Sequence, residues 1–71
     1  RNVRTFEKEI FNSPDMETKL ENEIKLAKKC GCEYELVWTK CSVFIRIEVE
    51  TTSQVAKFKF KANDYEELRD E

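Results

Sequence analysis

Histidine is absent from this sequence of 71 residues. Imidazole is the usual general base near neutral pH and the commonest metal ligand, so its absence removes serine-histidine and cysteine-histidine nucleophile pairs. Carboxylates are plentiful, but none is placed so that a pair divides the roles of acid and base. We therefore predict that the chain is not an enzyme, and no cofactor is indicated.

Glycine and proline are nearly absent as well, with one residue of each. A single glycine excludes the phosphate-binding loops of the GxxxxGK and GxGxxG types. The apolar runs are short, which excludes a membrane-spanning helix and the hydrophobic region of a signal peptide. We therefore predict a soluble chain without membrane insertion.

Cysteine occurs three times, at Cys30, Cys32 and Cys41, which is an odd number for a disulfide framework. A closed zinc site needs four ligands, and the chain has neither a fourth cysteine nor a histidine to complete one. We therefore predict free cysteines, no metal site and a reducing intracellular compartment, either the cytoplasm or the nucleus.

The charges nearly cancel, with 13 basic and 15 acidic residues. No global field therefore draws the chain to phosphate polymers. Apolar residues make up 39% of the sequence, which is enough for a thin core. The length allows one small domain over residues 1–71, and the start at Arg1 leads us to expect an excised piece of a longer chain or a processed product.

One long helix is predicted over residues 14–30. Ser13 supplies a capping hydroxyl, Pro14 suits the first helical position, and Gly31 supplies the left-handed residue that ends many helices. The apolar residues at helical spacing are Met16, Leu20, Ile24, Ala27 and Cys30.

After the glycine the apolar period changes to two, which predicts antiparallel strands over residues 33–38, 43–49 and 55–62. If residues 39–42 form the first turn, apolar residues face one another on the inner side of the sheet and Glu35 faces Arg46 on the outer side. The inner pairs are Trp38 with Val43, Leu36 with Ile45, and Tyr34 with Ile47. For the second turn two registers remain open, with Val49 opposite either Ala56 or Phe58.

The two ends of the chain are less regular. Residues 2–11 are either a helix or an edge strand, because their apolar residues fit one helical face and also tolerate an extended segment. Asn63 and Asp64, followed by Tyr65 and Leu68, predict a short C-terminal helix.

The predicted fold class is α+β, with the long helix packed on a three-stranded antiparallel meander. An N-terminal helix or edge strand and a short C-terminal helix complete it. The inner face that the long helix covers is predicted to carry Tyr34, Leu36, Trp38, Ile45, Ile47, Phe58 and Phe60.

The outer face of the predicted sheet pairs Val37 with Phe44, flanked by Arg46 and Glu35. Two apolar side chains on an otherwise charged face indicate that something covers them. The sequence therefore predicts a non-catalytic protein-protein interaction or regulatory module that uses these four residues.

Two kinds of cover fit the pair. One is internal, because Phe6 and Phe11 of the first segment need a place to pack. The other is a partner, either another protein or a second copy of this chain.

A row of lysines supports an alternative function. On the third predicted strand Lys57, Lys59 and Lys61 lie on one face, beside Arg46 and Phe44 of the neighbouring strand. A basic sheet with an aromatic residue is typical of proteins that bind single-stranded RNA. The alternative prediction is therefore an RNA- or DNA-binding domain, although nearby glutamates neutralise much of the row.

Overall fold

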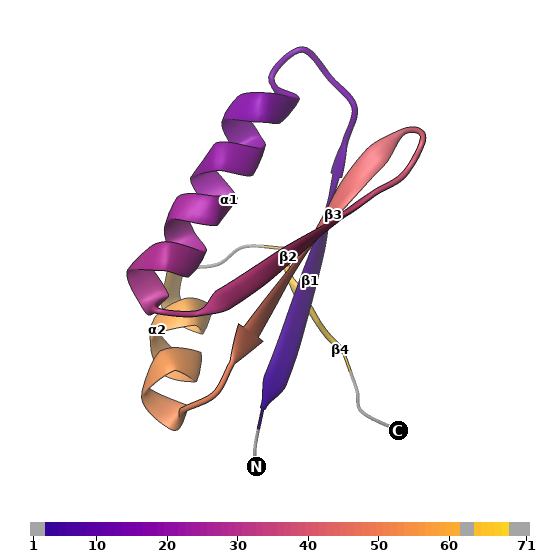
Figure 1. Cartoon of the computed structure of the whole chain (residues 1–71). Coiled ribbons are helices and arrows are strands. Elements are labelled where there is room, and N and C mark those ends of the chain that lie inside the picture. Colours follow the sequence, from indigo (N-terminus) through magenta and orange to yellow (C-terminus); the bar gives the residue numbers. More distant parts are fainter. Residues whose placement is uncertain (1–2, 62–63, 69–71) are drawn as a thin grey trace.

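A computed structural model describes residues 3–61 and 64–68, with the backbone alone for residues 59–61. Four strands and two helices follow one another along the chain (Figure 1). They are β1 (Arg4–Phe11), α1 (Met16–Cys30), β2 (Glu33–Trp38), β3 (Ser42–Val49), α2 (Thr52–Lys61) and β4 (Glu66–Leu68).

The strands form one antiparallel sheet in the order β2-β3-β1-β4. Both helices lie on the same face of this sheet (Figure 1). Helix α1 connects β1 to β2, and helix α2 connects β3 to β4. The two strands that each helix connects are parallel, and one antiparallel strand lies between them, which is β3 in the first case and β1 in the second. This arrangement is the ferredoxin-like, or split βαβ, topology. It leaves the other face of the sheet without a helical layer.

The predicted α+β class is confirmed, but the three-stranded meander is wrong. The third predicted strand, over residues 55–62, is replaced by helix α2 as far as Lys61, and Ala62 lies outside the described residues. The second predicted turn, with Val49 opposite Ala56 or Phe58, is therefore wrong as well. The segment has apolar residues at every second position, as a strand does. In the helix, however, Phe58 is the buried residue among the described side chains of α2.

A capping box explains why this segment is helical. The N–H of Gln54 donates to Oγ1 of Thr51 at 3.1 Å, and the N–H of Thr51 donates to Oε1 of Gln54 at 3.2 Å. The amide of Gln54 also donates to the carbonyl of Gly31 at 2.9 Å, which ties the start of α2 to the end of α1. Three hydrogen bonds thus fix a helix start that apolar alternation does not reveal.

The first segment is strand β1, and it lies in the centre of the sheet rather than at an edge. It pairs with β3 over eight residues, from Arg4 opposite Val49 to Phe11 opposite Ser42. The segment had been predicted as either a helix or an edge strand. Only an extended chain turns Phe6 and every second residue after it toward the helices.

The predicted C-terminal helix is wrong, since Glu66–Leu68 form strand β4 beside β1. Asp64 has a φ of 64°, and the ring of Tyr65 then packs edge-on against Phe58 at 4.9 Å. This contact directs the following residues along β1, and Arg4 donates two hydrogen bonds to the carboxylate of Glu67. Asn63, the other predicted start of that helix, lies outside the described residues.

Helix α1 confirms the predicted long helix but begins later. It starts at Met16, and the hydroxyl of Ser13 donates to the carboxylate of Asp15 at 2.7 Å instead of capping a helical N–H. Its end is as predicted, because Gly31 has a φ of 70° and its N–H donates to the last turn of the helix.

The β2–β3 hairpin has the predicted register. Trp38 lies opposite Val43, and the rest of the pairing follows without a bulge. The turn is held by Thr39, whose Oγ1 accepts the N–H of Ser42 at 3.0 Å. However, Tyr34 and Trp38 are exposed at 38% and 62% of their surface, because β2 is an end strand.

The core lies between the helices and the helix-facing side of the sheet. Its middle is a row of aromatic rings. The ring centroid of Phe58 in α2 lies 4.9 Å from that of Phe6 in β1 and 4.9 Å from that of Tyr65. The described side chain of Phe58 is 1% exposed, whereas that of Phe60 lies outside the described side chains. The buried apolar residues are Phe6, Ile10, Leu20, Ala27, Cys30, Val43, Ile45, Ile47, Val49 and Phe58.

Phe58→Ala tests this core. We expect the substitution to lower the free energy of unfolding by about 3 to 5 kcal/mol, which is comparable to the whole stability of so small a domain. Circular dichroism at ambient temperature should show loss of structure. Phe11→Ala is the control, because that ring is 63% exposed and its loss should leave the melting temperature nearly unchanged. Unchanged cooperative melting of Phe58→Ala would contradict the assignment.

Candidate functional site

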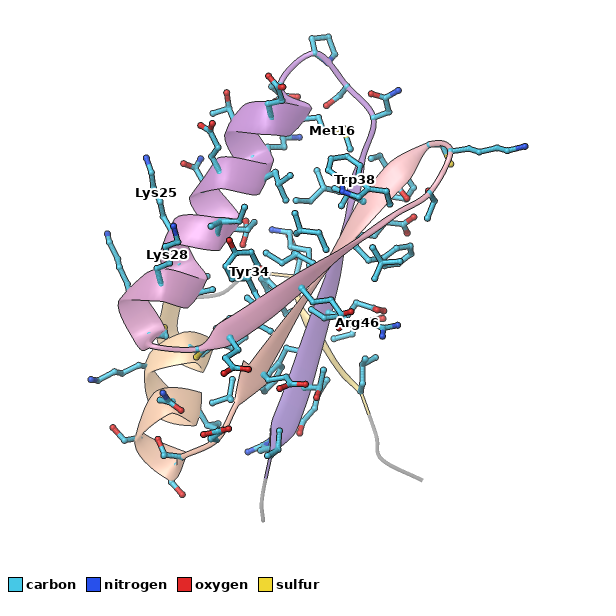
Figure 2. The ribbon with its side chains drawn as sticks, in the orientation of Figure 1. Met16, Lys25, Lys28, Tyr34, Trp38 and Arg46 are labelled. Carbon is cyan, nitrogen blue, oxygen red and sulfur yellow. The ribbon has the colours of Figure 1, made fainter. Side chains whose placement is uncertain are left out.

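In the part of the chain that the structure describes, neither helix covers one face of the sheet, which we call the open face. Paired residues of neighbouring strands point to the same side, so the register assigns each residue to a face. Figure 2 shows Arg46 pointing away from the helix layer. The open face carries Thr5, Glu7, Glu9, Phe11, Glu33, Glu35, Val37, Ser42, Phe44, Arg46, Glu48, Glu66 and Leu68.

Glutamates dominate the open face. Six of the thirteen positions named above are glutamates, and Arg46 is the one cation among them. Nε of Arg46 donates to Oε2 of Glu7 at 2.7 Å. This hydrogen bond, together with the charges of Glu7 and Glu35, raises the pKa of Arg46 above its ordinary value. The positive charge of Arg46 is thus already neutralised by its neighbours.

One end of the open face is apolar. Val37 lies directly opposite Phe44, as predicted. Phe11 lies opposite Ser42, which is two residues before Phe44 on β3, so Phe11 is the diagonal neighbour of Phe44. We call Phe11, Val37 and Phe44 the apolar corner. Val37 is 37% exposed and Phe11 is 63% exposed.

The sequence predicted that either Phe6 and Phe11 or a partner covers the pair of Val37 and Phe44. Phe6 lies on the helix-facing side, 4% exposed, and therefore cannot cover Phe44. Phe11 belongs to the corner and enlarges its exposed area. Phe44 itself is half-buried, so the corner is a partly exposed apolar surface that Phe11 extends.

The predicted basic row does not form. Lys57, Lys59 and Lys61 belong to helix α2, in the layer on the helix-facing side of the sheet, whereas Arg46 is on the open face. The row depended on a third strand beside β3, and β1 occupies that place. Sequence reasoning thus brought together residues that the fold separates.

The same error hid part of the open face. Glu7, Glu9 and Phe11 come from β1, and Glu66 comes from β4, neither of which was assigned as a neighbour of the hairpin. The alternation of β1 was visible in the sequence, but it does not reveal which strand lies beside it.

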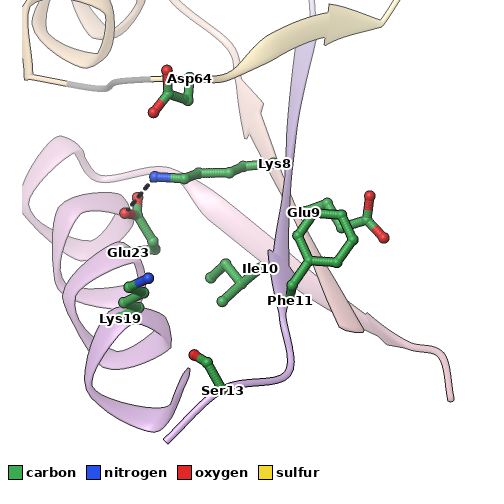
Figure 3. Close-up of a pocket in the computed structure, with 8 residues that line it drawn as sticks. All are labelled: Lys8, Glu9, Ile10, Phe11, Ser13, Lys19, Glu23 and Asp64. Atoms are coloured by element: carbon green, nitrogen blue, oxygen red, sulfur yellow. Dashed lines mark hydrogen bonds and ion pairs between the residues drawn. The ribbon is translucent and has the colours of Figure 1, made fainter. Parts of the chain in front are cut away.

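A pocket of about 410 Å³ lies between β1 and α1 (Figure 3). At its wall Nζ of Lys8 is 3.0 Å from Oε2 of Glu23, and the hydroxyl of Tyr65 donates to Oε1 of Glu23 at 2.8 Å. Burial, and then the hydrogen bond to Glu23, raises the pKa of Tyr65. Both oxygens of Glu23 are thus engaged, so this cluster holds β1, α1 and the start of β4 together instead of offering a free base.

The three cysteines do not form one cluster. Cys30 and Cys32 flank the end of α1, whereas Cys41 is in the turn at the opposite end of β2, and all three are free. Burial raises the pKa of Cys32, which keeps its thiol protonated and lowers its reactivity. Among the residues that the structure describes, no group of three or more metal-ligating side chains comes together. In the same part of the chain, neither helix combines the length and apolarity needed to cross a membrane.

Comparison of the chain with protein-family models, curated proteins and solved structures gives no match.

Tyr65→Phe tests the cluster through the pH dependence of stability. Because the folded pKa of Tyr65 lies above its ordinary value of 10.0, its contribution is complete below pH 10 and is lost as the pH rises further. We expect the free energy of unfolding of the native chain to fall more steeply above pH 10 than that of Tyr65→Phe. Urea denaturation at neutral and alkaline pH measures both slopes, and equal slopes would show that burial and the bond to Glu23 do not raise the pKa of Tyr65 in the folded chain.

Proposed function

We propose that this chain is a non-catalytic protein-protein interaction module that binds a basic protein segment through its open face. Val37 and Phe44 supply the apolar contact, and Glu35 and Arg46 lie beside them. The observation that carries the proposal is the apolar corner, exposed at the end of a face that is otherwise acidic.

Charge defines the class of partner. An acidic surface repels phosphate polymers and attracts lysine and arginine. A hollow of about 170 Å³ on the sheet is lined by Glu33, Tyr34, Glu35, Arg46 and Glu48. Three of these residues are carboxylates that favour a basic side chain.

The spacing of the two features defines the partner further. Val37 and Glu35 are two residues apart on one strand, which corresponds to about 7 Å. A partner with an apolar side chain about this far from a basic one would contact the corner and the carboxylates together. An apolar centre with a charged rim is also the usual organisation of protein interfaces.

The absence of imidazole from the chain supports a non-catalytic role. The three free cysteines support a reducing compartment, and we propose the cytoplasm or the nucleus. Nucleic acid is the alternative partner, and the experiment below tests it with the same protein.

Phe44→Ser tests the proposal. The probe is a synthetic peptide that carries phenylalanine two residues from lysine in a neutral chain, and binding is followed by the backbone amide shifts of the labelled protein. We expect salt-sensitive shifts centred on Val37, Phe44 and Arg46, and a loss of at least about tenfold in affinity for Phe44→Ser, which corresponds to about 1.4 kcal/mol.

Trp38→Ser is the matched control, because it removes an exposed ring from the helix-facing side of the sheet that does not line the hollow. A second peptide has glutamate in place of lysine and should bind more weakly. An uridine oligonucleotide is the third probe. Binding of the oligonucleotide in preference to the lysine peptide, or equal binding by native protein and Phe44→Ser, would contradict the proposal.

A further inference from the structure

Strand β2 lies at one end of the sheet, with β3 as its neighbour. It carries three of the four large hydrophobic residues that are exposed in the described part of the chain, Tyr34, Val37 and Trp38. Figure 2 shows Tyr34 and Trp38 on the side of helix α1. An apolar end strand is an unusual surface, because proteins generally protect such edges.

The backbone of β2 offers hydrogen bonds at this edge. The N–H of Thr39 donates to the carbonyl of Ser42 at 2.8 Å, and residues of an antiparallel pair alternate in the direction of their backbone groups. The odd-numbered residues of β2 therefore face β3. Tyr34, Leu36 and Trp38 point their N–H and C=O groups away from the sheet.

Apart from the charges of Glu33 and Glu35 on the open face, the usual protections of an edge are missing from β2. It contains no proline and no lysine, and its pairing with β3 runs without a bulge. The opposite edge, β4, is protected by its short length, since it pairs over Glu66–Leu68. The groups that would satisfy β2 are those of another extended strand.

We propose that a second copy of this chain supplies that strand, with the two β2 strands paired antiparallel about a two-fold axis through Leu36. The pairing would join two sheets into one of eight strands. It goes beyond the proposed function, because an edge-to-edge contact leaves both open faces accessible.

Side-chain pairing selects this register. To keep every residue on its own face, a two-fold axis must pass through a residue of β2. An axis through Glu35 would place that carboxylate opposite its own copy, which is destabilising. An axis through Val37 would pair fewer strand residues, because Tyr34 would lie opposite Lys40 of the turn.

The axis through Leu36 pairs strand residues with strand residues. Tyr34 of each copy then lies opposite Trp38 of the other, and these pairs flank Leu36 with its own copy. On the open face Glu35 lies opposite Val37, so no like charges face each other directly. Cross-strand aromatic pairs are among the more stabilising ones in sheets.

Sedimentation velocity of the full chain tests the proposal. A single strand pair is a small interface, so we expect a reversible monomer-dimer equilibrium between about 10 µM and about 1 mM. Trp38→Lys should raise the dimer dissociation constant by about tenfold or more, because it removes both aromatic pairs and charges the edge. Phe11→Lys is the matched control, since Phe11 is as exposed as Trp38 but lies away from the edge, and it should dimerise like the native chain.

Two further measurements keep the test independent of a folding defect. Tyr34→Pro removes an N–H that points to the free edge, and it should also weaken dimerisation while circular dichroism shows a folded monomer. In a mixture of labelled and unlabelled chains, isotope-filtered NMR should detect contacts between Tyr34 of one copy and Trp38 of the other.

A chain that stays monomeric over the whole range would overturn the proposal, as would a dimer that Phe44→Ser abolishes and Trp38→Lys leaves intact. Close contacts between the Hα atoms of Glu33 and of Val37 in the other copy would also overturn it, because these residues lie directly opposite each other in the register through Glu35. A chain that stays monomeric, or one that pairs through another register of β2, leaves the peptide binding of the open face untouched, so the two proposals can fail separately.

Discussion

The ring of Phe58 lies between the rings of Phe6 and Tyr65, 4.9 Å from each. These rings come from α2, from β1 and from the residue before β4, so this cluster of rings joins the C-terminal elements to a strand that is distant from them in sequence. Strand β4 has three residues, and its pairing with β1 alone is too short for independent stability. Tyr65, packed on Phe58 and bonded to Glu23, anchors it. The position of β1 at the centre of the sheet depends in turn on β4 forming its second neighbour.

Elements that depend on residues close together in the sequence were predicted well, and elements that depend on distant residues were not. Helix α1 and the β2–β3 hairpin are specified by residues close together, such as Gly31 at the helix end and the pairs around Thr39, and both were predicted with little error. Helix α2 was missed because its apolar residues alternate, while the reciprocal bonds of Thr51 and Gln54 that start it involve polar residues. The central place of β1 is a property of topology, which no periodicity encodes.

The candidate site follows the same rule. Val37, Phe44, Arg46 and Glu35 lie within one hairpin, so the register alone placed them together on one face. The acidic character of that face was hidden, because it depends on Glu7 and other residues of strands whose neighbours were unknown. The lysine row failed for the converse reason, since it relied on a strand pairing that the chain does not make. Surface charge is thus harder to predict than local pairing, because it sums over all neighbouring strands.

Trp38 is the single tryptophan of the chain, and it lies at the free edge of the sheet with 62% of its surface exposed. Its indole is already largely hydrated in the folded monomer, so unfolding changes its surroundings little. Intrinsic fluorescence of the isolated chain would therefore follow the loss of the core poorly. The same emission would change strongly when a contact excludes water from the edge of β2. The fluorescence of Trp38 therefore reports contacts at that edge.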